Sequence, residues 1–213
     1  MEGIQIIRNI LPVSQYVHEI TEKKYIALHH TAGGSAMSSI EYWKSNSDKV
    51  ATHFIIDRNG DIYQTMSMLY YGYHLGLKTK EYPNRIALES QSVSIEICSL
   101  GYLEKKGNDY ISPVTKKKVD AKIVETCEFR GFDFWETYTE KQVESLGQLI
   151  DYIGTTMKFK PESGNVDSDW FDFIPSLNKG LLKGRNIYTH TNFRKDKFDC
   201  FPCEKLINLL RKY

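Results

Sequence analysis

Two histidines and one carboxylate stand where a catalytic metal site is commonly built. His29 and His190 each lie where an expected strand runs out into a loop, and Asp199 follows in an extended segment. Strand ends that feed loops often carry functional residues. Two imidazoles and a carboxylate form a familiar catalytic zinc set, with the fourth position left for water. These three residues are a candidate zinc site, although their spacing alone does not distinguish it from three structural residues.

Two further residues could supply the other groups that hydrolysis of an amide needs. Lys197 precedes Asp199 by two residues, so in an extended loop the two side chains face the same way. Glu96 stands on the polar face of an otherwise apolar strand and fits a general base for water. Each residue also has an ordinary interpretation, because strand glutamates usually face solvent and a Lys-x-Asp pair is common.

The elements that would position these side chains are strands and helices in mixed order. Strands are predicted at residues 24–29, at the two arms of a hairpin within 52–64, at 92–98 and at 186–190. Helices are predicted at residues 37–46, after the Thr139-x-x-Gln142 capping box, and at 202–212. This mixture predicts one α/β domain over residues 1–213, with a mixed central β-sheet flanked by helices. Residues 101–180 form a less typical insertion, with a lysine-rich excursion first and a polar loop at 161–180.

Composition excludes several classes of partner. The 213 residues include 28 Lys and Arg against 27 Asp and Glu, a net charge of +1, so no strong field favours nucleic acid or an anionic membrane. No apolar run approaches the length of a membrane span. The first residues lack the pattern of a secretory signal, so we expect synthesis in the cytoplasm. The four cysteines are then expected to be thiols, although Cys200-x-x-Cys203 could be half of a metal or redox motif.

Five motifs, in the same order along the chain, resemble those of the zinc-dependent N-acetylmuramoyl-L-alanine amidases. That superfamily also contains the phage lysozyme-like amidases and the peptidoglycan recognition proteins. The motifs are Ile26-Ala-Leu-His-His-Thr-Ala-Gly33, the hairpin Thr52 to Gln64, Tyr73-His74-Leu-Gly76, Ser92-Val-Ser-Ile-Glu-Ile97, and His190 through Lys197-Phe-Asp199. They cover residues 25–100 and 186–203, whereas residues 101–180 match less specifically.

The resemblance implies a peptidoglycan recognition protein-like fold and a role for each candidate residue. It makes His29, His190 and Asp199 the ligands of Zn²⁺. It makes Lys197 a cation that stabilises the oxyanion, and Glu96 the catalytic glutamate. These assignments follow from the matching motif positions.

Four other positions bear on the same expectation. The resemblance implies that His74 lines the substrate groove, whereas His53 is expected to support the sheet. One branch of the family uses a tyrosine just before the hairpin histidine, but Thr52 stands there and cannot do a phenol's work, which favours Glu96 as the base. Cys200 follows Asp199 where the family pattern has Pro-Gly, so it is a competing zinc ligand.

The implied reaction is hydrolysis of the amide between N-acetylmuramic acid and L-alanine in peptidoglycan or muropeptides, by a monomer. The expected biological role is that of a phage endolysin that acts on the wall in the host periplasm, because we find no leader and no linker to an anchoring module. The alternatives are a cytoplasmic amidase that recycles wall fragments, a non-catalytic peptidoglycan-binding module, and a metalloenzyme acting on another amide.

Overall fold

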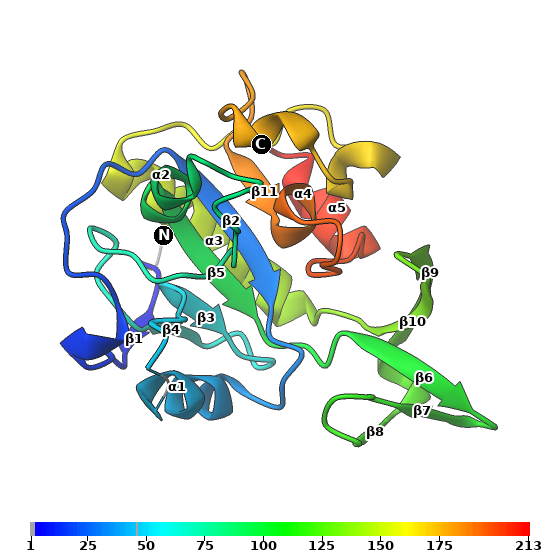
Figure 1. The fold of residues 1–213 in the computed structure, drawn as a ribbon. Coiled ribbons are helices and arrows are strands. Elements are labelled where there is room, and N and C mark those ends of the chain that lie inside the picture. The colour runs from blue at the N-terminus through cyan, green and yellow to red at the C-terminus, as the bar shows by residue number, and fades with distance from the viewer. Residues whose placement is uncertain (1–2, 46) are drawn as a thin grey trace.

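A mixed six-stranded sheet runs through the centre of the computed structural model, which describes residues 3–45 and 47–213 (Figure 1). Its strands are β1 (Ile6–Arg8), β2 (Tyr25–His30), β3 (Phe54–Ile56), β4 (Ile62–Gln64), β5 (Ser92–Ile97) and β11 (Ile187–Thr189). Their order is β1-β4-β3-β5-β2-β11, and only the hairpin pair β3–β4 is antiparallel. The hairpin turns at Asn59-Gly60, as this dipeptide predicts.

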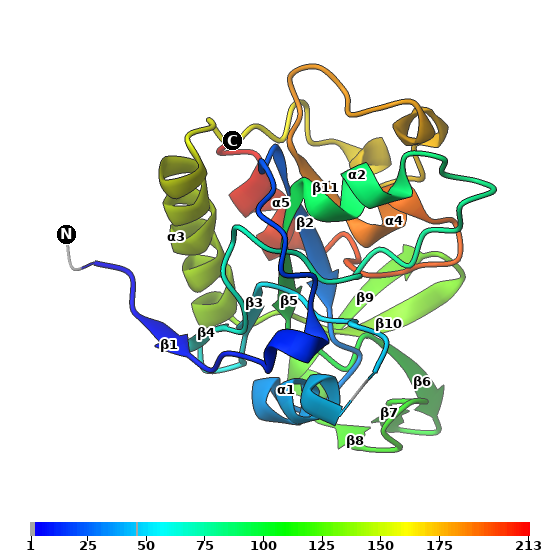
Figure 2. The ribbon, with the colours of Figure 1, turned by 60° about the vertical axis from the view of Figure 1, so that its left-hand side comes forward.

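Helices cover both faces of this sheet, which explains why β2 is buried along its whole length. The helices α3 (Glu140–Met157) and α5 (Glu204–Leu210) pack on one face, against Ile26, Leu28 and the apolar side of β5. The helices α1 (Ala36–Ser45) and α2 (Arg85–Ser90) lie on the other face (Figure 2). Shorter helical segments are η1 (Val13–Gln15), η2 (Ala121–Ile123), η3 (Ser168–Phe171), η4 (Pro175–Asn178) and α4 (His190–Phe193).

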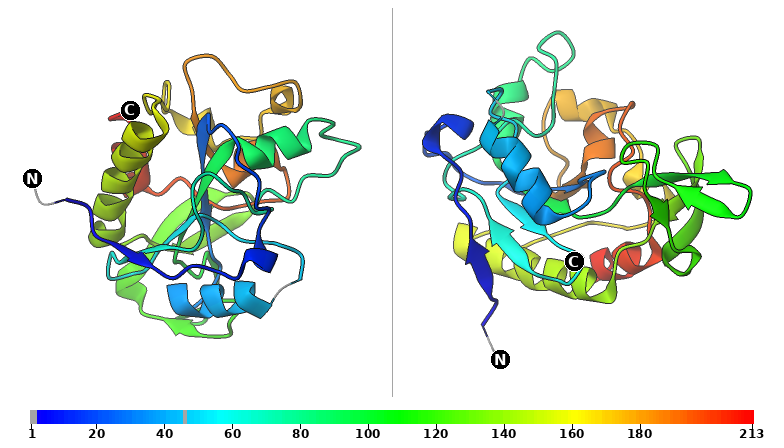
Figure 3. Two further views of the ribbon diagram at one scale, coloured as in Figure 1. Left: turned by 90° about the vertical axis from the view of Figure 1, so that its left-hand side faces the viewer. Right: turned by 90° about the horizontal axis from the view of Figure 1, so that it is seen from below.

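A second, five-stranded antiparallel sheet stands out at one side of the molecule (Figure 3). It consists of β6 (Tyr102–Lys106), β7 (Asp109–Ile111), β8 (Lys118–Val119), β9 (Val124–Phe129) and β10 (Phe132–Glu136). The contacts that join it to the rest of the chain include an ion pair and a stacked pair of rings. The Arg58 guanidinium donates two hydrogen bonds to the Glu136 carboxylate, at 2.8 and 2.7 Å. The Trp135 ring stacks on that of Phe201, with centroids 4.8 Å apart.

The predicted fold class is confirmed, as are the strands and helices of the central layers. The predicted helix end at Asn46 and the residues before Gly3 lie outside the described residues. The lysine-rich excursion is the second sheet, which we did not predict because β7 has no buried residue and β6 has only one. Within the described part of the chain, no helix is both long and apolar enough to cross a membrane.

The capping box of α3 also connects this helix to the central hairpin. The Thr139 hydroxyl oxygen accepts the backbone N–H of Gln142 at 3.1 Å, and the hydroxyl donates to the backbone carbonyl of Arg58 at 2.8 Å. The Gln142 side chain in turn accepts the backbone N–H of Thr139. One hydroxyl therefore satisfies a free helix N–H and holds the helix against the sheet.

We predict that Thr139→Ala lowers the free energy of unfolding by about 1–2 kcal/mol, because it removes a helix cap. Thr139→Ser keeps the hydroxyl and should retain most of this stability. Denaturant unfolding of the three proteins measures the difference. Equal losses in both variants would show that the methyl group, and not the cap, stabilises this end of α3.

Candidate metal centre

Three adjacent parallel strands bring the candidate residues to one edge of the central sheet. The register of β2 and β5 sets His29 opposite Glu96. The register of β11 and β2 sets Thr189 opposite Leu28, so His190 comes next to His29 at the start of α4. The carboxyl ends of parallel strands are where open α/β sheets commonly bind ligands. The sheet thus aligns a carboxyl group and two imidazoles in one row.

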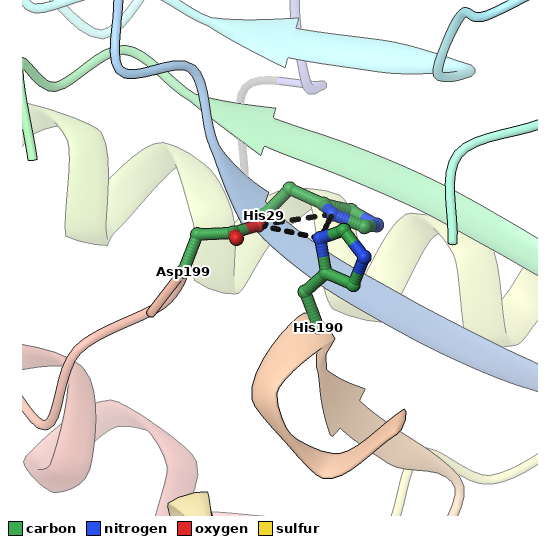
Figure 4. Close-up of side chains that lie close together, drawn as sticks. All are labelled: His29, His190 and Asp199. Carbon is green, nitrogen blue, oxygen red and sulfur yellow. Dashed lines mark hydrogen bonds and ion pairs between the residues drawn. The ribbon is translucent and has the colours of Figure 1, made fainter. Parts of the chain in front are cut away.

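Asp199 joins the two histidines from the loop that follows α4 (Figure 4). Nδ1 of His29 lies 3.0 Å from Nδ1 of His190 and 3.2 Å from Oδ2 of Asp199. Nδ1 of His190 lies 2.9 Å from the same oxygen. The three residues are only 2%, 5% and 8% exposed. Ligands held about 2.0–2.1 Å from a tetrahedral zinc ion are about 3.3 Å apart, so these separations are close to those of a zinc site.

Hydrogen bonding determines which His190 nitrogen is free to bind a metal. Nε2 of His190 lies 2.9 Å from the backbone carbonyl of Leu75, which can only accept, so Nε2 carries a proton. Nδ1 is then the ring nitrogen that faces Asp199 and His29 and that is placed to bind a metal. A divalent cation placed between the two Nδ1 nitrogens and the Asp199 oxygen could be bound by all three atoms.

The electrostatic environment favours the forms of these side chains that bind metal. Burial, with the neighbouring His190, lowers the pKa of His29 to about 4, so this imidazole is neutral near pH 7. Burial alone would raise the pKa of Asp199, but its close contacts with His190 and His29 outweigh burial and hold the pKa well below its usual range. A neutral imidazole and an ionised carboxylate are the forms that ligate a metal.

Glu96 and Lys197 line the same hollow as the three ligands. Oε2 of Glu96 is buried and has no hydrogen-bond partner among the described residues. Burial and then the charge of Asp199 raise the pKa of Glu96 well above its usual range, while Lys197 acts in the opposite direction. Nζ of Lys197 has no ion-pair partner within residues 3–45 and 47–213. A carboxyl group whose buried oxygen has no partner is a candidate for proton transfer.

The second sheet holds the loop that supplies Lys197 and Asp199. The ring of Phe198, between them, packs 5.0 Å from that of Tyr102 and 5.6 Å from that of Phe132, measured between centroids. The guanidinium of Arg130, at the turn between β9 and β10, donates to the backbone carbonyl of Lys195 at 2.6 Å. The second sheet therefore fixes the segment that carries Asp199, the third candidate ligand.

Of the two other histidines considered above, His74 lies beneath the candidate ligands and His53 lies away from them. The His74 side chain is 2% exposed, at the floor of the hollow, and its Nδ1 lies 2.8 Å from Nε2 of His29. Contact between His74 and substrate therefore stays a prediction, whereas its contact with a ligand is observed. His53 supports the sheet, because its ring bonds the Ser94 hydroxyl at 2.9 Å and the Tyr70 carbonyl at 2.8 Å.

Cys200 is directed away from the metal site. Its side chain is fully buried in the main hydrophobic core together with Phe201 and Cys203, and all four cysteines are free thiols. Burial and the neighbouring Asp199 charge hold the pKa of the Cys200 thiol well above its usual range, which disfavours a thiolate ligand. The described residues place Asp199, rather than Cys200, beside the two histidines.

Comparison with known proteins gives one family. A family model described as N-acetylmuramoyl-L-alanine amidase matches residues 20–197, a span that includes four of the five site residues and ends before Asp199. A search of curated proteins found no match.

Several solved structures have a similar fold, with TM-scores above 0.5. The Staphylococcus aureus hydrolase AmiA in complex with its ligand has a TM-score of 0.57 at 13% identity, over 99% of this chain and 82% of that chain. A mutant of PlyL has a TM-score of 0.54 at 13% identity, over 98% and 99%. The catalytic domain of XlyA has a TM-score of 0.53 at 17% identity, over 97% and 99%. At these identities the likeness shows a shared fold.

We predict that Asp199→Ala removes most bound metal, because it deletes one of three converging ligands, whereas Cys200→Ser keeps it. Metal content per chain after dialysis, together with the midpoint of thermal unfolding, tests both variants. Loss of metal from Cys200→Ser with full retention in Asp199→Ala would show that the thiol is the third ligand.

Proposed function

The chain belongs to the N-acetylmuramoyl-L-alanine amidase family, and on that premise we propose that it hydrolyses the amide bond between the lactyl group of N-acetylmuramic acid and L-alanine in peptidoglycan. The observation that carries the proposal is the convergence of His29, His190 and Asp199 beside Glu96 and Lys197. A group of three possible metal ligands next to a carboxyl oxygen without a partner favours hydrolysis over binding alone.

Zinc is the proposed cofactor, supported by the chemistry of the donor set. Two imidazoles and one carboxylate, those of His29, His190 and Asp199, are typical of catalytic zinc sites that keep a position open for water. When bound, a zinc ion lowers the pKa of its water to about 7 and polarises a carbonyl group.

Glu96 and Lys197 perform the remaining steps in this proposal. Glu96 accepts the proton of the attacking water and passes it to the leaving amine of L-alanine. No internal hydrogen bond competes for its Oε2 within the described residues. The raised pKa of Glu96 makes its carboxylate a stronger base than an exposed glutamate. Lys197, in the same hollow, sets a positive charge beside the oxyanion that develops on the substrate carbonyl.

The surface around Glu96 supports a polymeric substrate. The hollow over the ligands meets a second one at Thr31 and Glu96, and Ser38, Tyr42 and Trp43 of α1 line the latter. A substrate that extends beyond the bound unit would find room in this second hollow. This room favours an endolysin that cuts intact wall over an amidase that recycles small soluble fragments, and we propose that the endolysin acts as a monomer.

Glu96→Gln should reduce the rate by roughly 10²-fold or more, the usual size of a general acid–base effect. Zinc content and the unfolding midpoint should not change, because the amide nearly matches the carboxyl group in shape. Glu104→Gln, on the exposed part of β6, is the matched control and should keep the wild-type rate. Near-normal turnover by Glu96→Gln would leave Glu96 with a structural role only.

The substrate is tested by offering intact sacculi and soluble muropeptides side by side. We expect faster cleavage of sacculi, with new ends that mass spectrometry identifies as a muramyl lactyl carboxylate and a free L-alanine amine. Cleavage restricted to soluble fragments would favour wall recycling. Tight binding of sacculi without new ends, by the zinc-loaded protein, would favour a binding module.

A further inference from the structure

We propose that His74, Ser92 and Glu89, buried behind the ligands, are positioning residues that fix the tautomers of His29 and His190 so that both rings present Nδ1 to the metal. This inference rests on the proposed zinc site and goes beyond it, because none of the three side chains touches the metal position. The three residues act in two ways. Ser92 and His74 form a chain of hydrogen bonds that ends at His29, which we call the relay. Glu89 binds the backbone of the segment that contains His74 and Leu75.

The direction of the relay follows from its last acceptor. The Ser92 hydroxyl donates to the backbone carbonyl of Glu89 at 2.9 Å. Its oxygen therefore accepts the Nε2–H of His74 at 2.6 Å, which leaves Nδ1 of His74 as an acceptor. Nδ1 of His74 therefore accepts a hydrogen bond from Nε2–H of His29, which lies 2.8 Å away. Nδ1 of His29 is then bare and faces His190 and Asp199.

The opposite direction is disfavoured at two points. It would turn the Ser92 hydroxyl toward His74 and leave the Glu89 carbonyl without this donor, a costly loss for a buried group. It would also move the His74 proton from Nε2 to Nδ1, although Nε2 lies 3.6 Å from the Glu89 carboxylate, which favours a proton on Nε2. With His74 donating, His29 would carry its own proton on Nδ1, where the metal binds.

Glu89 connects the two histidine ligands. Its carboxylate accepts the backbone N–H of His74 at 2.9 Å and that of Leu75 at 3.1 Å. The His74 ring then orients His29, and the Leu75 carbonyl accepts the Nε2–H of His190 at 2.9 Å. One buried carboxylate therefore holds the short segment that orients both imidazoles. Outer partners of this kind typically contribute 10–100-fold to metal affinity.

The chain contains a matched control for this relay. Two residues after Ser92 on β5, the buried Ser94 hydroxyl lies 2.9 Å from Nδ1 of His53. The His53 ring ends on the Tyr70 carbonyl and touches no ligand. Ser92 and Ser94 are therefore two buried serines on one strand, each bonded to a histidine, and only the first lies behind the metal site.

The test compares Ser92→Ala, Ser94→Ala, His74→Leu and His74→Asn with the wild type in the full chain. Zinc affinity is measured by competition with a chromophoric chelator, and stability by unfolding of the metal-free proteins. We expect Ser92→Ala and His74→Leu to weaken zinc binding about 10–100-fold. Ser94→Ala should keep wild-type zinc affinity although it also loses a buried hydrogen bond. His74→Asn should recover part of the affinity, because its side-chain oxygen can accept near the position of Nδ1.

A spectroscopic readout reports the tautomer itself. Nitrogen-15 NMR of the metal-free wild type should show His29 protonated on Nε2, and Ser92→Ala should shift it toward protonation on Nδ1. Equal zinc affinity in wild type, Ser92→Ala and His74→Leu would overturn the inference, as would equal weakening by Ser92→Ala and Ser94→Ala. Neither readout uses peptidoglycan, so a wild type that shows the expected zinc and NMR pattern but fails to cleave sacculi or muropeptides would overturn the proposed function alone.

Discussion

Three electron-pair donors are held within 3.2 Å of one another in a space largely shielded from solvent, and much of the chain serves to keep them there. Burying two imidazoles and a carboxylate removes their hydration and forces their lone pairs together, which is unfavourable without a compensating charge. The surrounding structure opposes this cost with rigid elements and directed hydrogen bonds. A cation bound among these donors would remove the repulsion, which supports the proposed metal site.

Each of the three candidate ligands is held in a different way, and the differences follow from the elements that carry them. His29 lies near the end of a fully buried central strand, and His190 opens a short helix after the neighbouring strand, so the sheet register determines their spacing. Asp199 comes from a loop and needs outside help, which the rings of Tyr102 and Phe132 provide through Phe198. The relay behind the histidines adds orientation to position, because a strand end alone does not fix how an imidazole ring is rotated or protonated.

The strands and helices of the central layers were predictable because their buried residues recur at the spacing of a strand or a helix. Strand ends indicated His29 and His190, and alternation along β5 indicated Glu96. The choice between Asp199 and Cys200 was not decidable in this way, because the local course of one loop determines which neighbour faces the histidines. The contact of His74 with His29 spans 45 positions and His74 lies in an irregular segment, so no local pattern encodes the contact. The second sheet was missed because half-exposed polar strands resemble loops.

The second sheet also constrains how this protein can change over time. Residues 102–136 resemble a detachable decoration, since most of their strands face solvent. Yet the ring of Phe198 packs on aromatic rings of this sheet, and the backbone carbonyl of Lys195 accepts a hydrogen bond from the guanidinium of Arg130. A deletion in the second sheet would remove the contacts that hold the loop bearing Asp199. Such a deletion would have to be accompanied by compensating substitutions around residues 195–199. The two segments are thus expected to be inherited as one unit, although about sixty residues separate them along the chain.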